Sequence, residues 1–227
     1  MNDLWQEMGP QLWPAFWITI QLTFWSAIGS LIWGVLLAGM KVSPVPVMRG
    51  FATVYVNVVR NTPLTLIILL CSIGLYQNLG LALAADNANF IENNNFRLAV
   101  LGFILYTSTF VCETLRAGFN TVPLGQAEAA RSIGLGFSQV FGLIILPQAL
   151  RAVIAPMGSV LIALTKNTTI ASIIGVGEAA LLMKEELENF ADQILVIFAV
   201  FAIGFMIITL IEGLIFGWAA KRWAVKR

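Results

Sequence analysis

A short polar run, Thr165-Lys166-Asn167-Thr168, lies inside one of the long apolar stretches of this 227-residue chain. The lysine ammonium suits a carboxylate, and the neighbouring hydroxyl and amide groups can hydrogen-bond a zwitterion. An ionisable residue within a membrane span is costly and is by default a functional candidate. We therefore predict that Lys166, Asn167, Thr168 and Thr165 contact a polar solute. The alternative is that Lys166 pairs with an outer carboxylate or extends its ammonium to the membrane surface.

A second polar break, "RNTP", contains Arg60 and Asn61 just before Pro63. Proline lacks a backbone N–H and frees the carbonyl one turn before it. Freed backbone groups are tolerated inside a membrane only where protein or a water-filled cavity covers them. Arg60 and Asn61 are therefore predicted to contact a passing solute, and the alternative is that Arg60 anchors the helix at the headgroups.

The other ionisable groups in apolar stretches have simpler interpretations. Glu113 and Arg116 stand three apart, so we expect them to pair on one helix face, and Glu212 is expected to pair with a basic neighbour. Cys71 and Cys112 lie in apolar runs whose spacing suggests neither a metal site nor a disulfide. The chain has no His, the commonest general base and metal ligand. We predict no catalytic residues, and a polytopic membrane enzyme is the less favoured alternative.

The elements that position these residues are predicted to be membrane helices. The chain is 59% hydrophobic and 11% charged, whereas a soluble domain carries about 25% charged residues. A span needs roughly 20 apolar residues, which predicts an all-α integral membrane protein with a single domain over residues 1–227. The expected five spans cover about 13–40, 54–83, 96–119, 152–176 and 194–220, and residues 140–150 are too few for another. The acidic N-terminus argues against a cleaved leader.

The charges predict the orientation of these spans. Basic residues accumulate on the cytoplasmic side of membrane proteins. With the N-terminus outside and the C-terminus inside, most of the 13 Lys and Arg residues face the cytoplasm. These are Lys41, Arg49, Arg60, Arg116, Arg131, Arg151, Lys221, Arg222, Lys226 and Arg227. The acidic residues gather mainly on the outer face, and a net charge of +1 gives no reason to expect a nucleic-acid partner.

Small residues recur every fourth position on two spans and predict close helix contacts. They are Ser26, Ser30, Gly34 and Ala38 on the first span, and Thr209, Gly213 and Gly217 on the fifth. Such spacing lets helix backbones approach in lipid. Packing within the chain is favoured over an interface between subunits.

Residues 119–140 form the expected cytoplasmic loop between the third and fourth spans. Pro123 suits a first helical turn, Glu128 and Arg131 stand one turn apart, and Gly134 can take the left-handed conformation that ends a helix. The loop therefore predicts a short surface helix of about three turns. It lacks the Trp, Phe and Lys that anchor helices lying on membranes.

The same loop resembles a known family. "EAARSIGLGFSQVFGLIILP" fits the EAA signature of the permease subunits of binding-protein-dependent ABC importers. "RNTPLTLIILL", "ETLRAGFNTVPLGQAEAARSIGL" and "LPQALRAVIAPMGSVLIALTKNTTIASIIGVGE" resemble stretches of the polar amino-acid permeases. The resemblance extends from about residue 15 to the C-terminus.

The resemblance implies a type I ABC importer permease fold in a bacterial inner membrane, with five spans and the N-terminus outside. It implies that the loop helix is a coupling helix, with Gln126, Glu128, Ala129, Ala130, Arg131 and Gly134 seated against a cytoplasmic ATPase dimer. The chain has no GxxxxGK[ST] loop, so ATP and Mg²⁺ belong to that partner, and no cofactor is expected here. A second permease chain, identical or homologous, and an extracytoplasmic solute-binding protein complete the expected transporter.

Departures from the family pattern bear on the substrate. Asn167 stands where the family usually has Asp, Ser159 where it has Asn, and Thr165 where it commonly has Leu. An acidic group missing beside Lys166 leaves the local field more positive, which favours an anionic solute. We therefore predict glutamate, or the glutamate/glutamine class. The alternatives are another polar or basic amino acid, or an ATP-independent channel or carrier subunit.

Overall fold

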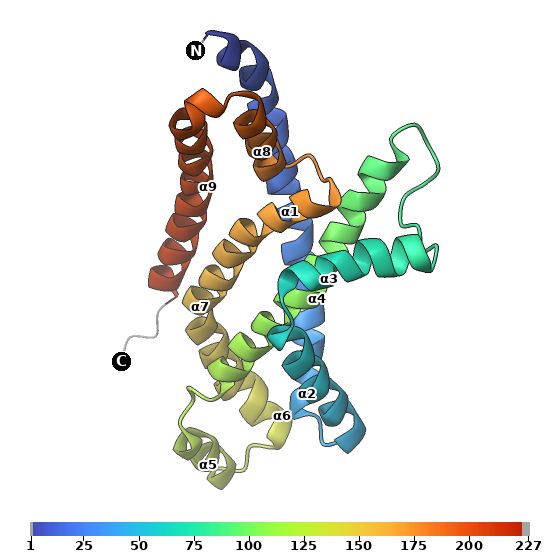
Figure 1. Ribbon diagram of the computed structural model, residues 1–227. Helices are drawn as coiled ribbons and strands as arrows, with labels where there is room; N and C mark the ends of the chain where they lie inside the picture. Colours follow the sequence, from blue (N-terminus) through green and yellow to red (C-terminus); the bar gives the residue numbers. More distant parts are fainter. Residues whose placement is uncertain (1, 224–227) are drawn as a thin grey trace.

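Figure 1 shows the computed structural model of the chain, in which residues 2–223 are described. Every regular element in that range is a helix, which confirms the predicted all-α class. In chain order the elements are α1 Asn2–Val42, α2 Pro46–Asn61, α3 Leu64–Leu69, η1 Leu70–Asn78, α4 Phe90–Phe119, α5 Leu124–Ser132, α6 Phe137–Val140, η2 Phe141–Ile145, α7 Leu146–Asn167, η3 Thr168–Ile174, α8 Ala179–Asn189, η4 Ala191–Gln193 and α9 Ile194–Arg222. Lys226 and Arg227 lie outside the described residues.

Several expected spans correspond to long apolar helices. In the described range, four stretches are long and apolar enough to cross a membrane: Asp3–Val42, Phe90–Phe119, Ser138–Ile174 and Ala191–Arg222. The pair of Pro46–Asn61 and Leu64–Asn78 meets the same criterion only when taken together. Up to five spans therefore fit, while the side that each end faces stays a prediction.

The first helix begins earlier than the expected start near residue 13. α1 already begins at Asn2, and the side chains of Leu4 and Met8 in its first turns are fully buried. They pack in one apolar cluster with Ala179 and Leu182 of α8. Contact with α8 therefore stabilises a helical segment whose own composition is partly polar.

The expected second span is divided at the "RNTP" break. Thr62 takes an extended backbone, with φ −90° and ψ 133°, as expected for a residue before proline. α2 ends at Asn61, a new helix begins at Leu64, and the two are bent by 107°. The interruption is confirmed, and the helices on its two sides cover Pro46–Asn61 and Leu64–Asn78, whereas the expected span covers 54–83.

The helix that contains the expected fourth span begins before residue 152. Residues 140–150, too few to cross a membrane by themselves, continue directly into α7, so that Ser138–Ile174 forms one long stretch. Pro147 is tolerated because it occupies the first turn of α7, directly after the π-helical Phe141–Ile145. A proline in a first helical turn removes no intrahelical hydrogen bond.

Small residues on α1 pack within the chain, as predicted. Ser26, Ser30 and Ala38 are buried, and a Cβ added at Gly34 would lie 2.5 Å from Cγ1 of Val111 on α4. On α9, by contrast, Gly213 faces a methyl group of α7 only at van der Waals distance, and Gly217 faces open space. The α1 spacing is therefore explained by close packing against α4.

The two ends of the helix assembly differ in charge. In Figure 1, α8 lies beside the start of α1 at one end, and α5 projects from the opposite end. The α8 end collects acidic side chains: Asp3, Glu7, Glu178, Glu185, Glu186 and Glu188. The opposite end carries Lys41 in the last turn of α1, Arg116 in that of α4, and Lys221 and Arg222 in that of α9.

Candidate functional site

The α5 segment adopts the predicted short helix. Leu124–Ser132 has nine residues, about two and a half turns, slightly fewer than the three expected. Pro123 caps its start, and Gly134 takes a φ of +92°. This is the left-handed region, which side chains rarely adopt, so the helix ends where the glycine predicted. Leu135 N–H donates to the carbonyl of Ala130 at 3.2 Å and completes the turn.

The predicted coupling residues divide between an outward and an inward face. Gln126, Glu128, Ala129 and Arg131 are exposed, whereas Ala130 is only 4% exposed. Ala130 therefore faces its own chain and fixes the helix against it. Two apolar side chains of the same segment, Leu124 and Ile133, are also exposed, by 81% and 79%. The α5 segment therefore presents a surface of polar and apolar side chains that the rest of the described chain does not cover.

One side-chain contact joins α5 to α7. Gln148 Nε2 donates to Gln126 Oε1 at 2.7 Å and to the carbonyl of Ile144 at 2.9 Å. Gln126 is in α5, and Gln148 is in the first turn of α7. The 22-residue α7 is about 33 Å long, so a displacement of α5 reaches residues far from it.

The far end of α7 carries the polar run. Thr165 is fully buried, and its hydroxyl donates to Glu212 Oε1 of α9 at 2.7 Å and lies 3.2 Å from the carbonyl of Leu161. The other carboxylate oxygen of Glu212 is buried without a partner in the described part of the chain. The expectation that Glu212 pairs with a basic neighbour is wrong, because α9 turns it toward a threonine.

After Asn167 the chain continues as the 3₁₀-helix η3, Thr168–Ile174. Thr168 is fully buried, and its hydroxyl donates to the carbonyl of Thr165 at 2.7 Å. Lys166 is exposed, and among residues 2–223 its side chain makes no ion pair or hydrogen bond; Asn167 is half-buried. The alternative in which Lys166 pairs with an outer carboxylate therefore finds no support in the described structure.

The "RNTP" break and the polar run share one apolar core. Leu64 and Ile68 of α3 pack in the same cluster as Leu164 of α7 and Ala171 of η3. The turn after Pro63 thus brings α3 against the segment that follows Lys166. Arg60 and Asn61 stand just before that turn.

Arg60 and Asn61 themselves end on the surface of α2. Both are exposed, and Asn61 Nδ2 donates to the carbonyl of Asn57 at 2.7 Å. The structure brings the break as a whole to the α7–η3 core, while these two polar side chains remain outside that core.

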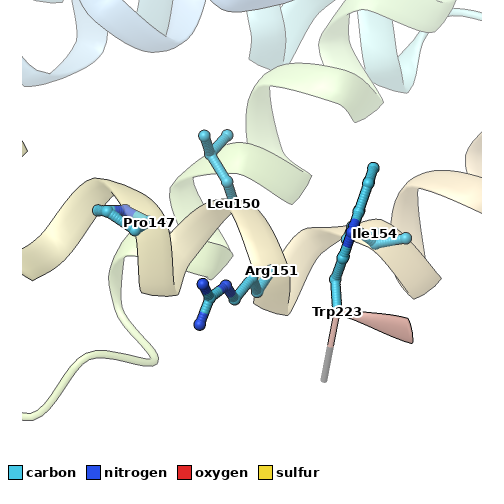
Figure 2. Close-up of a pocket in the computed structure, with 5 residues that line it drawn as sticks. All are labelled: Pro147, Leu150, Arg151, Ile154 and Trp223. Carbon is cyan, nitrogen blue, oxygen red and sulfur yellow. The ribbon is translucent and has the colours of Figure 1, made fainter. Parts of the chain in front are cut away.

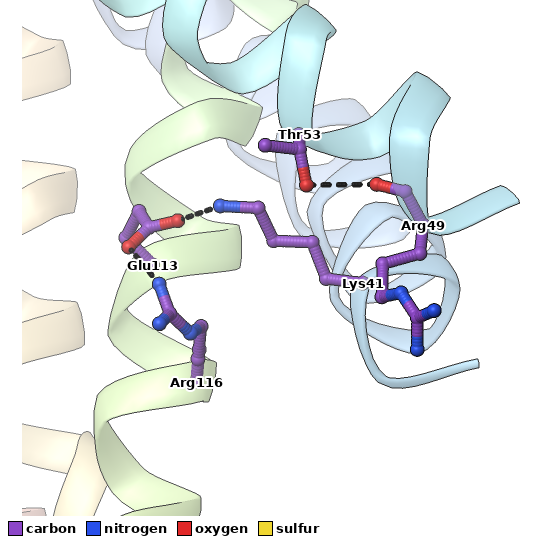
Figure 3. A network of polar contacts seen from close by, with 5 residues as sticks. All are labelled: Lys41, Arg49, Thr53, Glu113 and Arg116. Carbon is purple, nitrogen blue, oxygen red and sulfur yellow. Dashed lines mark hydrogen bonds and ion pairs between the residues drawn. The ribbon is translucent and has the colours of Figure 1, made fainter. Parts of the chain in front are cut away.

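A charged network joins α1 to α4 (Figure 3). Glu113 accepts from Lys41 of α1 through Oε1, and Arg116 Nη1 lies 3.3 Å from Glu113 Oε2. The predicted Glu113–Arg116 pair is confirmed, and Lys41, whose side chain is 10% exposed, is an additional partner. This network explains Glu113 without any ligand.

At the acidic end, Glu178 caps α8. It is fully buried, and its carboxylate accepts from the backbone N–H groups of Leu181 at 3.0 Å and Ala180 at 2.9 Å. Burial raises the pKa of Glu178 to about 7, although these two bonds and one from Thr19 oppose the rise. The pKa of Glu186 is also raised, first by burial and then by Glu7 and Glu185.

Three partners were missed from the sequence: Gln148 for Gln126, Lys41 for Glu113, and Thr165 for Glu212. Each partner lies at least 22 positions away along the chain. No helical or strand periodicity links such distant positions. Within residues 2–223, acidic, cysteine and histidine side chains form no group of three that could hold a metal ion.

Comparisons with known proteins agree with this architecture. Residues 30–225 match the family described as the binding-protein-dependent transport system inner membrane component. The chain is 64% identical to the glutamate transport system permease protein GluC of Corynebacterium efficiens and 63% identical to that of Corynebacterium glutamicum, each time over 228 residues and 100% of both chains. The fold is similar to that in a crystal structure of an amino acid ABC transporter with histidines. The TM-score is 0.83 at 26% identity, covering 94% of each chain.

Proposed function

Because the chain belongs to the family of binding-protein-dependent transport system inner membrane components, we propose that it carries glutamate inward as the permease subunit of an ATP-driven importer. The main support for glutamate as the substrate is the match over the full chain, at 64% identity, to a glutamate transport permease. The positive environment of Lys166, where Asn167 adds no compensating charge, also supports an anionic solute.

The proposed assembly contains two permease chains, identical or homologous, two ATPase subunits and an extracytoplasmic solute-binding protein. ATP and Mg²⁺ bind the ATPase, which docks on the exposed surface of α5 around Glu128, Ala129 and Arg131. The N-terminus and the acidic α8 end face outward, and the α5 end faces the cytoplasm. The segregation of acidic and basic side chains to opposite ends supports this orientation.

Coupling would proceed through α7. When the ATPase moves α5, the Gln126–Gln148 hydrogen bond and the packed Ala130 transmit the displacement to the start of α7. Because α7 is continuous from Leu146 to Asn167, a displacement of its start would be passed along the helix, with Pro156 as the point where it can bend. The far end of α7 carries Lys166, so its position would change with the nucleotide state of the ATPase.

Lys166 and Asn167 are the proposed solute contacts of this chain. Lys166 has a charge that no other described residue neutralises, and Asn167 is accessible beside it. Thr165 and Thr168 would support these two residues indirectly, because their hydrogen bonds hold the backbone at the α7–η3 junction. Arg60 and Asn61 are proposed to contact solute on the other side of the break.

Uptake by the purified transporter in proteoliposomes tests the substrate. Labelled glutamate should enter with ATP, and excess glutamate should compete better than excess arginine. Lys166→Gln should raise the KM for glutamate about tenfold, because one charge-assisted contact is lost. Lys184→Gln, an exposed lysine of α8, is the control and should leave the KM unchanged. Preferential uptake of arginine would overturn the glutamate proposal.

A second experiment tests the ATPase coupling. Gly134→Asp forces a side chain into φ +92° and distorts the end of α5. Transport should fall at least tenfold while the chain remains inserted, and ATP hydrolysis should become independent of substrate. Gly125→Asp in the first turn of the same helix, where an added Cβ meets nothing within 4 Å, is the control. Wild-type transport by Gly134→Asp would contradict the coupling role.

A further inference from the structure

A groove of about 530 Å³ lies between the first half of α7 and the end of α9. Its walls are Pro147, Leu150, Arg151 and Ile154 of α7, together with Trp223 directly after α9 (Figure 2). Figure 2 shows the indole of Trp223 standing beside Ile154, with the Arg151 guanidinium at the side of the same helix. The lining is therefore apolar, apart from one cation and the indole N–H.

The Arg151 guanidinium has no acidic partner among the described residues. It is exposed, and within the described residues it makes no ion pair or hydrogen bond; no carboxylate lines the groove. Lys221 and Arg222, the last two residues of α9, are exposed next to Trp223. Arg151 is therefore the one cation among the described residues that line the groove, and two further basic residues precede Trp223 in sequence.

The helix that borders the groove on one side, α9, is also the most apolar candidate span in the described part of the chain. Along α9, side chains such as Met206, Leu210, Leu214 and Trp218 are each more than half exposed, as expected for a helix that faces acyl chains. A tryptophan at the end of such a helix is typical of the boundary between acyl chains and headgroups. A ligand in this groove would therefore meet apolar side chains together with the Arg151 guanidinium.

We propose that this α7–α9 groove binds an anionic phospholipid of the cytoplasmic leaflet. Arg151 pairs with the lipid phosphate through a two-pronged hydrogen bond, as a planar guanidinium does. Lys221 and Arg222 add positive potential, and Leu150, Ile154 and Trp223 cover the upper part of one acyl chain. Basic pockets between membrane helices on the cytoplasmic side recognise anionic headgroups by this combination of groups.

A free phosphate ion fits these features less well. Inorganic phosphate would use Arg151 but would leave the apolar wall exposed to water, which is unfavourable. A lipid satisfies both parts of the groove. The assignment rests on the proposed orientation, in which this end faces the cytoplasm. It also places a lipid directly after Pro147 and the α5–α7 junction, where it would stiffen the start of α7.

The test is the retention of lipid by the purified transporter, which does not depend on glutamate uptake. The protein is assembled in nanodiscs containing equal amounts of phosphatidylglycerol and phosphatidylcholine, then extracted in mild detergent, and the bound lipids are counted by native mass spectrometry. Wild type should retain phosphatidylglycerol in preference to phosphatidylcholine. Arg151→Gln should lower that retention about fivefold, the factor expected for one basic side chain at an anionic surface.

Two further variants separate the alternatives. Arg49→Gln removes an exposed arginine of α2 away from the groove and should retain lipid like wild type. Trp223→Ala keeps every charge but removes the apolar wall, so it should also lower retention, whereas binding of a free phosphate would not change. Equal retention of both lipids by wild type, or full retention by Arg151→Gln, would overturn the proposal.

A second permease chain is the competing occupant of the groove. A Leu150→Cys variant, in a chain whose Cys71 and Cys112 are replaced by Ala, tests whether a second permease chain occupies the groove. Efficient disulfide cross-linking between two copies through Cys at this position would show a protein interface and overturn the lipid assignment. Labelling of the same thiol by a maleimide lipid, without cross-linked dimers, would support it.

Discussion

The two ends of α7 show two ways of holding polar groups. At its start, α5 displays exposed polar and apolar side chains and is held to α7 by one side-chain hydrogen bond, Gln148 to Gln126. At its far end, Thr165 and Thr168 are fully buried and bonded to α9 and to their own helix. The exposed α5 surface at the first end calls for a partner outside the chain. At the second end the two threonine hydroxyls are bonded within the chain, while Lys166 and the second oxygen of Glu212 have no partner among the described residues.

Substitutions at the two ends of α7 should therefore affect different properties, coupling at one end and stability at the other. A change on the exposed α5 surface should leave folding nearly intact and alter coupling, because surface substitutions rarely change stability by more than about 0.5 kcal/mol. A change at the buried end should destabilise the chain itself, because a buried polar group that loses its partner is costly.

The largest effect is expected from pH at the α8 cap, beyond the buried end of α7. Glu178 binds its proton more tightly in the folded chain than at its ordinary pKa of 4.5, because burial raises the pKa to about 7. This proton contributes fully to stability below pH 4.5, and the contribution is lost as the pH rises through about 7. The difference corresponds to about 3 kcal/mol.

Thermal unfolding of the detergent-purified transporter between pH 5 and pH 8 measures this effect. The wild type should lose stability toward pH 8, and Glu178→Gln, which keeps an acceptor for the two backbone N–H groups, should flatten the curve. Glu186 titrates in the same direction, so Glu186→Gln should flatten it as well. An unchanged slope in both variants would show that neither carboxyl controls this end.

The next effect concerns the Thr165–Glu212 contact. Thr165→Val removes the only described donor to Glu212, whose second oxygen already lacks a partner, and should destabilise the chain by about 2 kcal/mol. The double variant Thr165→Val/Glu212→Leu removes both polar groups and should recover most of that loss. Chemical denaturation in detergent measures both, and additive losses would contradict the contact.

The smallest effect is expected at the exposed end. Gln148→Leu removes the two hydrogen bonds that Gln148 Nε2 donates, to Gln126 and to the carbonyl of Ile144, each worth about 1 kcal/mol. Loss of the contact with α5 should lower ATP-coupled uptake about fivefold and leave the unfolding temperature nearly unchanged. Gln126→Leu should give the same loss, and combining the two variants should add nothing. A large drop in unfolding temperature would mean that this contact stabilises the fold, and the contrast between the two ends of α7 would fail.

The sequence predicted much of the fold because its signals are local. Apolar runs of span length, the proline at residue 63 and the glycine at residue 134 act on the backbone within a few residues of themselves. The "EAARSIGLGFSQVFGLIILP" segment then identified the family, which the comparisons confirm. Boundaries were less accurate where neighbours override local composition: α1 extends to Asn2 because α8 covers it, and α7 begins before residue 152 because Pro147 fits its first turn.

Local sequence patterns were enough to predict the class of the protein, the break in the second span, the position of α5 and the polar run of α7. Which side chains meet is visible only in the folded chain: Gln126 with Gln148, Lys41 with Glu113, and Thr165 with Glu212. Backbone geometry depends on neighbours a few residues away and leaves a pattern in the sequence. Contacts between helices depend on how each helix is rotated and packed against the others, which no spacing within a single helix records.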